Sequence, residues 1–196
     1  MRAIKAAGLA ALLVMLISPA VQAGPPTEQL QSGMDRIFTM LADPGLKPAD
    51  KLEEKRAKVF AVAEELFDFG HTARLALGAH WDRLSPTERD EFIALFKGFI
   101  QKAYITNVEM YDGEKIVYAA ETVDGEKATV KSRIVTKSGG EIPVDFRLLR
   151  TEGDRWRLYD VAIDGMSLVG NYRVQFMKVM KAESYQALVQ KLRAKQ

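Results

Sequence analysis

Residues 115–163 read KIVYAAETVDGEKATVKSRIVTKSGGEIPVDFRLLRTEGDRWRLYDVAI. Apolar and polar side chains alternate along this stretch, which is the period of a β-strand with one buried face. Glycine-containing turns divide it into four candidate strands at residues 115–122, 128–136, 142–150 and 155–163. Because loops this short join neighbouring strands, the stretch predicts an antiparallel four-stranded sheet.

Helical patterns flank the strands on both sides. Apolar residues recur at three- and four-residue steps in the segments 27–42, 48–67, 68–82, 85–110, 167–180 and 183–194. Ser85-Pro86-Thr87-Glu88 is typical of a capping box and predicts the start of the longest helix, and Ser167 is expected to cap the helix that it precedes. The order of helices, strands and helices predicts an α+β fold.

The first 23 residues have the layout of a secretory signal peptide. Arg2 and Lys5 precede a twelve-residue apolar run, and Val21-Gln22-Ala23 ends in small residues suited to cleavage. The run is shorter than the ~20 residues that span a bilayer, although an uncleaved anchor is the alternative. We therefore expect a signal peptide at residues 1–23 and one domain at residues 24–196. Residue 24 is Gly, so no lipidated cysteine follows the expected cut.

The charge balance changes with the signal peptide. The whole chain has 28 Lys and Arg against 26 Asp and Glu, and the excess of two corresponds to Arg2 and Lys5. The remaining 173 residues carry balanced charge, which disfavours a nucleic-acid partner. Cysteine is absent, so an exported chain has no disulfides, and a bacterial periplasm fits better than free secretion.

Few residues indicate catalysis or metal binding. The chain has two histidines, His71 and His80, and no spacing typical of a zinc site. Residues 165–170 read GMSLVG, which is one residue too long for the nucleophile motif G-x-S-x-G. We expect no catalytic residue, no metal and no cofactor, although spacing alone leaves an Asp/Glu pair open.

Apolar residues are abundant and permit two interpretations. They can fill an ordinary core, or a sheet curved over helices can leave an apolar cavity for a small molecule. An acyl chain gains about 0.8 kcal/mol per buried CH₂, so roughly ten carbons give ~8 kcal/mol. A site for an acyl chain needs a matching shape and an apolar lining, but few charged residues.

Several motifs in order resemble the MlaC family, whose members are also called toluene-tolerance auxiliary proteins. The resemblance runs from about residue 30 to the C-terminus. Its motifs are Phe67-Asp68-Phe69, Ala73-Arg74, Leu77-Gly78-Ala79-His80-Trp81, Phe92…Phe96, Trp156-Arg157-Leu158-Tyr159-Asp160-Val161, Asp164-Gly165-Met166-Ser167-Leu168-Val169, Asn171-Tyr172-Arg173 and Gln175-Phe176.

The resemblance implies a non-enzymatic periplasmic lipid carrier in a Gram-negative bacterium. Such a carrier belongs to an ABC transport system that maintains outer-membrane lipid asymmetry. Its cargo would be phospholipid, and its partners an inner-membrane ABC transporter complex and an outer-membrane lipoprotein complex. The implied fold is a curved antiparallel sheet packed with helices in an NTF2-like shape, with acyl tails buried in an apolar cavity between the layers.

Apolar character and position indicate a set of candidate lipid-binding residues. They are Phe92, Phe96, Phe99 and Ile100 on the long helix, Val130, Ile134, Val144, Phe146 and Leu148 on the sheet, and Met166, Leu168, Val169, Tyr172 and Phe176 from the last motifs. Arg74 and Arg173 are candidates for a phosphate headgroup, but pairing with a carboxylate such as Asp160 is the preferred interpretation.

Three alternatives remain. The cargo is another apolar lipid such as a hopanoid, the fold is an enzyme with an ionisable pair in its cavity, or the protein is a periplasmic adaptor with a filled core. A structure with a polar constellation inside the cavity favours the enzyme, and a structure without an apolar cavity favours the adaptor.

Overall fold

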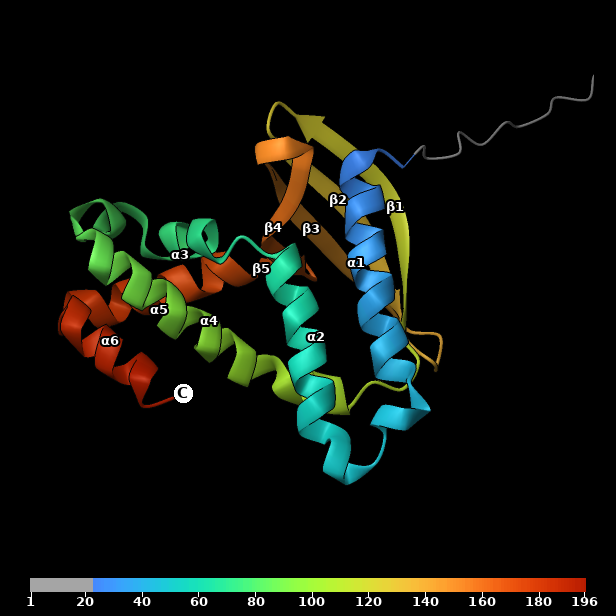
Figure 1. Ribbon diagram of the computed structural model, residues 1–196. Helices are drawn as coiled ribbons and strands as arrows, with labels where there is room; N and C mark the ends of the chain where they lie inside the picture. The colour runs from blue at the N-terminus through green and yellow to red at the C-terminus, as the bar shows by residue number, and fades with distance from the viewer. Residues whose placement is uncertain (1–22) are drawn as a thin grey trace, which may run out of the picture.

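A computed structural model describes residues 23–196, apart from the side chains of residues 105–109. The expected signal peptide lies outside the described residues except for Ala23. Within the described part, the chain forms six α-helices and one five-stranded sheet (Figure 1). The helices are α1 (Pro25–Ala42), α2 (Leu52–Leu66), α3 (Phe69–Leu77), α4 (Pro86–Glu109), α5 (Leu168–Ala182) and α6 (Tyr185–Arg193). Short 3₁₀ turns lie at Pro44–Leu46, Ala49–Lys51, Gly78–Arg83 and Glu152–Asp154.

The sheet is antiparallel throughout, with its strands in sequence order. Its strands are β1 (Lys115–Asp124), β2 (Lys127–Val135), β3 (Glu141–Thr151), β4 (Arg155–Ile163) and β5 (Met166–Ser167). The α+β class and the antiparallel sheet are confirmed, but the expected count of four strands is wrong. The fifth strand has two residues, which is too short to give an alternating pattern in the sequence. Asp164 and Gly165, both at positive φ, turn the chain back so that β5 pairs with β4.

The sheet packs one face against α1, and its other face is solvated except near α5, where Asp160 and Ala162 of β4 are buried. Val130 pairs with Phe146 across β2 and β3, and both are buried beside Leu30 of α1. Lys131, on the opposite face, is exposed. This confirms the expectation of one apolar and one solvated face. We call the buried set the sheet core, whose members are Leu30, Ala128, Val130, Val144, Phe146, Leu148, Trp156 and Leu158.

A second core lies among the helices α3 to α6. Phe92 and Phe96 of α4 are almost fully buried against α5, and the rings of Phe96 and Phe176 meet edge-to-face at 5.2 Å between centroids. Tyr185 of α6 closes the cluster. We call this set the helical core. It shares no buried residue with the sheet core, and Figure 1 shows the two halves side by side, with α2 between them.

Local sequence signals set several boundaries. Ser85 and Glu88 form the expected capping box, with the Ser85 amide donating to the Glu88 carboxylate at 2.9 Å and the Glu88 amide to the Ser85 hydroxyl at 3.3 Å. Ser167 caps α5 as expected, accepting from the Gly170 amide. The first helix begins at Pro25, because its two prolines fit the first helical turn. Thr27 is therefore inside the helix, and its hydroxyl donates to Glu121 of β1.

Candidate functional site

An apolar pocket of about 240 Å³ lies where the two halves of the molecule meet. The helix α2, Phe67 and the end of β4 form the wall nearer the sheet core, and α3, α4 and the start of α5 form the wall nearer the helical core. Its lining residues are Phe60, Ala63, Glu64, Phe67, Phe69, Thr72, Lys97, Ile100, Gln101, Tyr104, Val161, Ile163 and Leu168. The pocket is partly open to solvent. The expected enclosed cavity between sheet and helices is therefore corrected to an open pocket at the seam.

The short link between α2 and α3 places aromatic rings in this pocket. Phe67 forms an isolated parallel bridge with Leu158 of β4, and the Asp68 amide donates to the Leu158 carbonyl at 2.7 Å. Asp68 then caps α3 by accepting from the His71 amide at 2.8 Å. The chain thus changes from strand-like to helical within two residues. Phe67 and Phe69 stack at 5.5 Å between ring centroids as a result.

Thr72 is the most deeply buried polar residue of the pocket, with 1% of its surface exposed. Its hydroxyl lies 2.7 Å from the Asp68 carbonyl and 3.1 Å from the Tyr159 carbonyl. The polar atom is therefore satisfied by the backbone. Thr72 therefore has no free donor to offer a ligand.

A buried carboxylate positions the start of α5. Asp160 of β4 accepts from the Arg147 guanidinium at 2.7 Å, from the Ser167 hydroxyl at 2.6 Å and from the Val169 amide at 3.0 Å. These bonds fix the residues on both sides of Leu168, which lines the pocket. Asp160 therefore joins the sheet to the helix that carries one pocket wall.

The sequence suggested Arg74 or Arg173 as the partner of Asp160, but Asp160 is paired with Arg147. Arg74 lies near Asp82, 3.9 Å away at the surface. Arg173 lies against Gly78, where an added Cβ would be 3.0 Å from its Nη2 atom. The strand register explains the difference, because Arg147 is directly opposite Asp160 across β3 and β4.

A tyrosine pair connects the pocket wall to the helical core. Tyr104 lines the pocket, and its side chain is hydrogen-bonded to Tyr172. Burial raises the pKa of the Tyr172 phenol above its usual range, and the bond to Tyr104 raises it further. The Tyr172 phenol is therefore neutral at physiological pH.

The charged lining residues of the pocket are Glu64 and Lys97. They come from facing helices, α2 and α4, and the Lys97 Nζ lies 3.1 Å from the Glu64 Oε1. Their side chains are 48% and 37% exposed, respectively, so the pair lies at the mouth of the pocket. The lining thus combines an apolar interior with one ion pair at the solvent side.

The fourteen candidate residues from the sequence divide among four places. Ile100 and Leu168 line the pocket. Met166 is 73% exposed. Six others belong to or pack on the helical core, namely Phe92, Phe96, Phe99, Val169, Tyr172 and Phe176, and the pocket residues Ile100 and Leu168 also pack on it. Five belong to or pack on the sheet core, namely Val130, Ile134, Val144, Phe146 and Leu148.

The α2 side of the pocket was not among the candidates. Phe60, Ala63 and Phe67 follow one another at helical spacing and line the pocket. The helix α2 also buries Val59 and Val62, which do not line the pocket. The width of this apolar face is a signal in the sequence that could have identified the α2 wall. An apolar face wide enough to meet two neighbours indicates a helix between two layers. Lys97 gave a second signal, because it is a cation flanked by the apolar residues Phe96 and Phe99 on α4.

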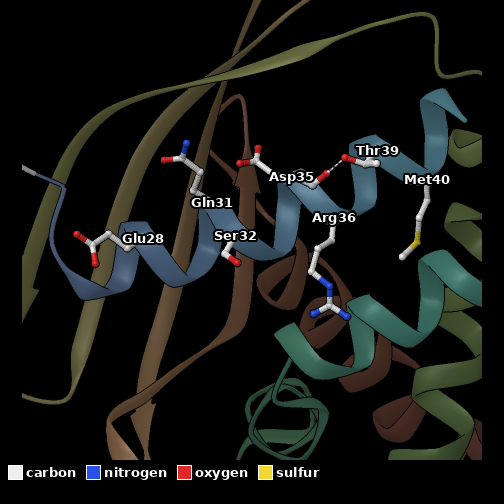
Figure 2. A pocket seen from close by; sticks show the side chains of 7 residues that line it. All are labelled: Glu28, Gln31, Ser32, Asp35, Arg36, Thr39 and Met40. Atoms are coloured by element: carbon white, nitrogen blue, oxygen red, sulfur yellow. Dashed lines mark hydrogen bonds between the residues drawn. The ribbon is translucent and has the colours of Figure 1, made fainter.

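A larger hollow of about 600 Å³ on the outer face of α1 does not form a comparable site. Its lining residues are Glu28, Gln31, Ser32, Asp35, Arg36, Thr39 and Met40. Figure 2 shows these side chains spread along one helix and pointing in different directions, with Thr39 bonded to the Asp35 carbonyl of its own helix. Arg36 is paired with Glu65 of α2 at 2.6 Å. The residues do not converge, so we interpret this hollow as a solvated helix face.

The described part of residues 23–196 contains no cluster of three or more His, Cys, Asp or Glu side chains arranged to hold a metal ion. Over the same residues, no helix combines the length and apolarity needed to cross a membrane.

The fold and the pocket define an α+β protein with an apolar pocket between two cores. A family model described as MlaC protein matches residues 31–194, and the chain belongs to the MlaC family. The fold is also similar to that of a phospholipid-binding protein from Ralstonia solanacearum, solved in complex with a phospholipid. The two chains share 22% identity with a TM-score of 0.77, and the match covers 88% of this chain and 97% of the other.

Proposed function

We propose that this protein is a periplasmic phospholipid carrier without enzymatic activity. The apolar pocket at the seam is the observation that carries the proposal, because its deep polar group, Thr72, is satisfied internally. A lipid tail needs such a lining and gains about 0.8 kcal/mol per buried CH₂. Membership of the MlaC family and the phospholipid bound to the Ralstonia solanacearum protein support the choice of phospholipid as cargo.

The pocket must widen to hold a whole tail. Its volume of about 240 Å³ is below the ~300–1,000 Å³ of typical pockets for drug-sized ligands. The two walls rest on separate cores, so the seam can open without exposing the buried residues of either one. Tails enter between α2 and α4 in this proposal, and the headgroup stays at the mouth.

The family and the sequence together support a proposed cellular role. Residues 1–23 direct export, and residues 24–196 form the single lipid-binding domain. The carrier receives and delivers phospholipid at an outer-membrane lipoprotein complex and an inner-membrane ABC transporter complex, and so helps to maintain outer-membrane lipid asymmetry. Balanced charge after cleavage and the absence of cysteine are consistent with this periplasmic role.

Mass spectrometry of the purified protein tests the proposal. The full chain is expressed in a Gram-negative host, purified from the periplasm and extracted with organic solvent. We expect a phospholipid at a stoichiometric fraction, a mature N-terminus at Gly24, and reloading of stripped protein from phospholipid vesicles. A hopanoid or another lipid in the extract would identify the alternative cargo. Absence of any lipid, together with failure to reload, would refute the carrier function.

A further inference from the structure

The ion pair at the pocket mouth connects the two halves of the molecule. Glu64 belongs to α2, whose C-terminal end is tied to β4 because Arg157 donates to the carbonyls of Glu64 and Phe67. Lys97 belongs to α4, which carries Phe92 and Phe96 of the helical core. The 3.1 Å contact between Lys97 and Glu64 therefore spans the seam directly over the pocket.

The position and exposure of the Glu64–Lys97 ion pair allow it to break when a lipid tail enters. Both side chains are more than a third exposed, and ion pairs of this kind contribute little to stability. A tail that enters between α2 and α4 has to separate the walls that the pair connects. The Lys97 ammonium then needs a new anionic partner, and a compact ammonium group is a common phosphate ligand in proteins.

Among the described lining residues, no second cation is available to the phosphate. The remaining polar groups there are Thr72, Gln101 and Tyr104, and the Thr72 hydroxyl already faces two backbone carbonyls. Glu64 would repel an anion at the same mouth. We propose that Lys97 exchanges the Glu64 carboxylate for the phosphate of the lipid headgroup when cargo binds, so that the ion pair closes the empty pocket and selects phosphate-bearing lipids. This inference rests on the proposed carrier function.

Substitution of Lys97 and substitution of Glu64 should have opposite effects on lipid binding. Opposite effects distinguish phosphate binding by Lys97 from a purely structural ion pair. Lys97→Gln removes the phosphate contact and should weaken phosphatidylglycerol binding about two- to five-fold, the range of an exposed ion pair. Glu64→Gln removes the competing carboxylate and should strengthen it by a similar factor. Lys97→Arg keeps the cation and should retain the wild-type preference. Lys191→Gln, which breaks a surface pair with Glu183 far from the pocket, is the matched control.

Two further ligands, each lacking one part of a phospholipid, serve as controls. Diacylglycerol has the tails but no phosphate, so both variants should change its binding in the same direction. Inorganic phosphate has no tails and should neither bind measurably nor displace lipid. Binding is measured by transfer from vesicles of each lipid, with thermal melting to verify the fold of each variant.

Three outcomes decide between the explanations. Opposite effects of the two variants on phosphatidylglycerol, absent with diacylglycerol, support the exchange. Equal effects on both lipids overturn it and leave the carrier function intact, and Lys97-dependent binding of inorganic phosphate overturns it in favour of a free anion site. If the wild-type protein binds neither lipid, the carrier function itself fails.

Discussion

The Ser167 hydroxyl donates a 2.6 Å hydrogen bond to the buried carboxylate of Asp160. The same carboxylate binds Arg147 across the sheet and the Val169 amide at the start of α5. One side chain thus fixes the angle at which the last long helix leaves the sheet. Because Leu168 lies between two of these partners, the junction also sets the position of a pocket wall.

Replacement of the Asp160 charge should destabilise the fold. Asp160→Asn keeps the shape of the side chain but leaves Arg147 without its carboxylate, and hydrogen bonds to charged groups contribute about 1.5–3 kcal/mol. We expect a loss of that size in the free energy of unfolding measured with urea. Asp145→Asn, on the same strand as Arg147 and half-buried, should change it by no more than about 0.5 kcal/mol. Equal losses in the two variants would contradict a special role for Asp160.

A larger side chain at Ala63 should block lipid binding and leave the fold intact. Ala63 lines the pocket on α2, whereas Ala61 is exposed on the same helix. A phenylalanine that displaces two methylenes of a tail costs about 1.6 kcal/mol, roughly a ten-fold loss in affinity. Ala63→Phe should therefore lower the lipid content measured by mass spectrometry, while Ala61→Phe retains it. Normal lipid content in Ala63→Phe would place the cargo elsewhere.

Substitutions at two residues of α4 should affect the stability of the fold and lipid binding differently. Phe92 is fully buried in the helical core, and Phe→Ala changes at such sites cost about 3–5 kcal/mol. Ile100, two turns further on, is half-buried in the pocket, so Ile100→Ala should cost about 1 kcal/mol. Urea unfolding and vesicle loading are measured on both. Lipid binding should fall in Ile100→Ala and persist in Phe92→Ala under conditions where that variant is folded. The reverse pattern would argue for a cavity inside the helical core.

His71 should make stability depend on pH. Burial lowers the pKa of its imidazole below the ordinary 6.5, against the opposing pull of Asp68, and the ring packs edge-on against Tyr159. The unfolded chain therefore binds more protons than the folded one below pH 6.5, and stability falls as pH drops from 6.5 towards the folded pKa. His71→Asn should reduce this fall in thermal melts taken on either side of pH 6.5. An undiminished fall in His71→Asn would contradict this role of His71.

Features that depend on neighbouring residues were predictable from the sequence. The Ser85 and Glu88 capping box, the Ser167 cap and the turns between the long strands all involve groups a few residues apart. Alternation along β3 likewise identified the buried face of the sheet. The strand β5 was not predicted, because two residues are too few to show an alternating pattern.

The position of the pocket depends on packing between distant segments, so it could not be predicted in the same way. Phe92 and Ile100 lie on the same helix and are both apolar. What separates them is that Phe92 faces Phe176 of α5, whereas Ile100 faces α2 and β4. The Arg147 partner of Asp160 similarly required the register of two strands, which fixes residues opposite one another across 13 positions of sequence.

The separation of the two cores has a consequence for how this protein can change. Some of the pocket residues, among them Phe60, Ala63 and Ile163, are half-exposed or exposed and belong to neither core. Substitutions there alter the shape and size of the compartment at small cost in folding free energy. A different ligand preference can therefore be acquired by single mutations at the seam, while the two cores stay unchanged.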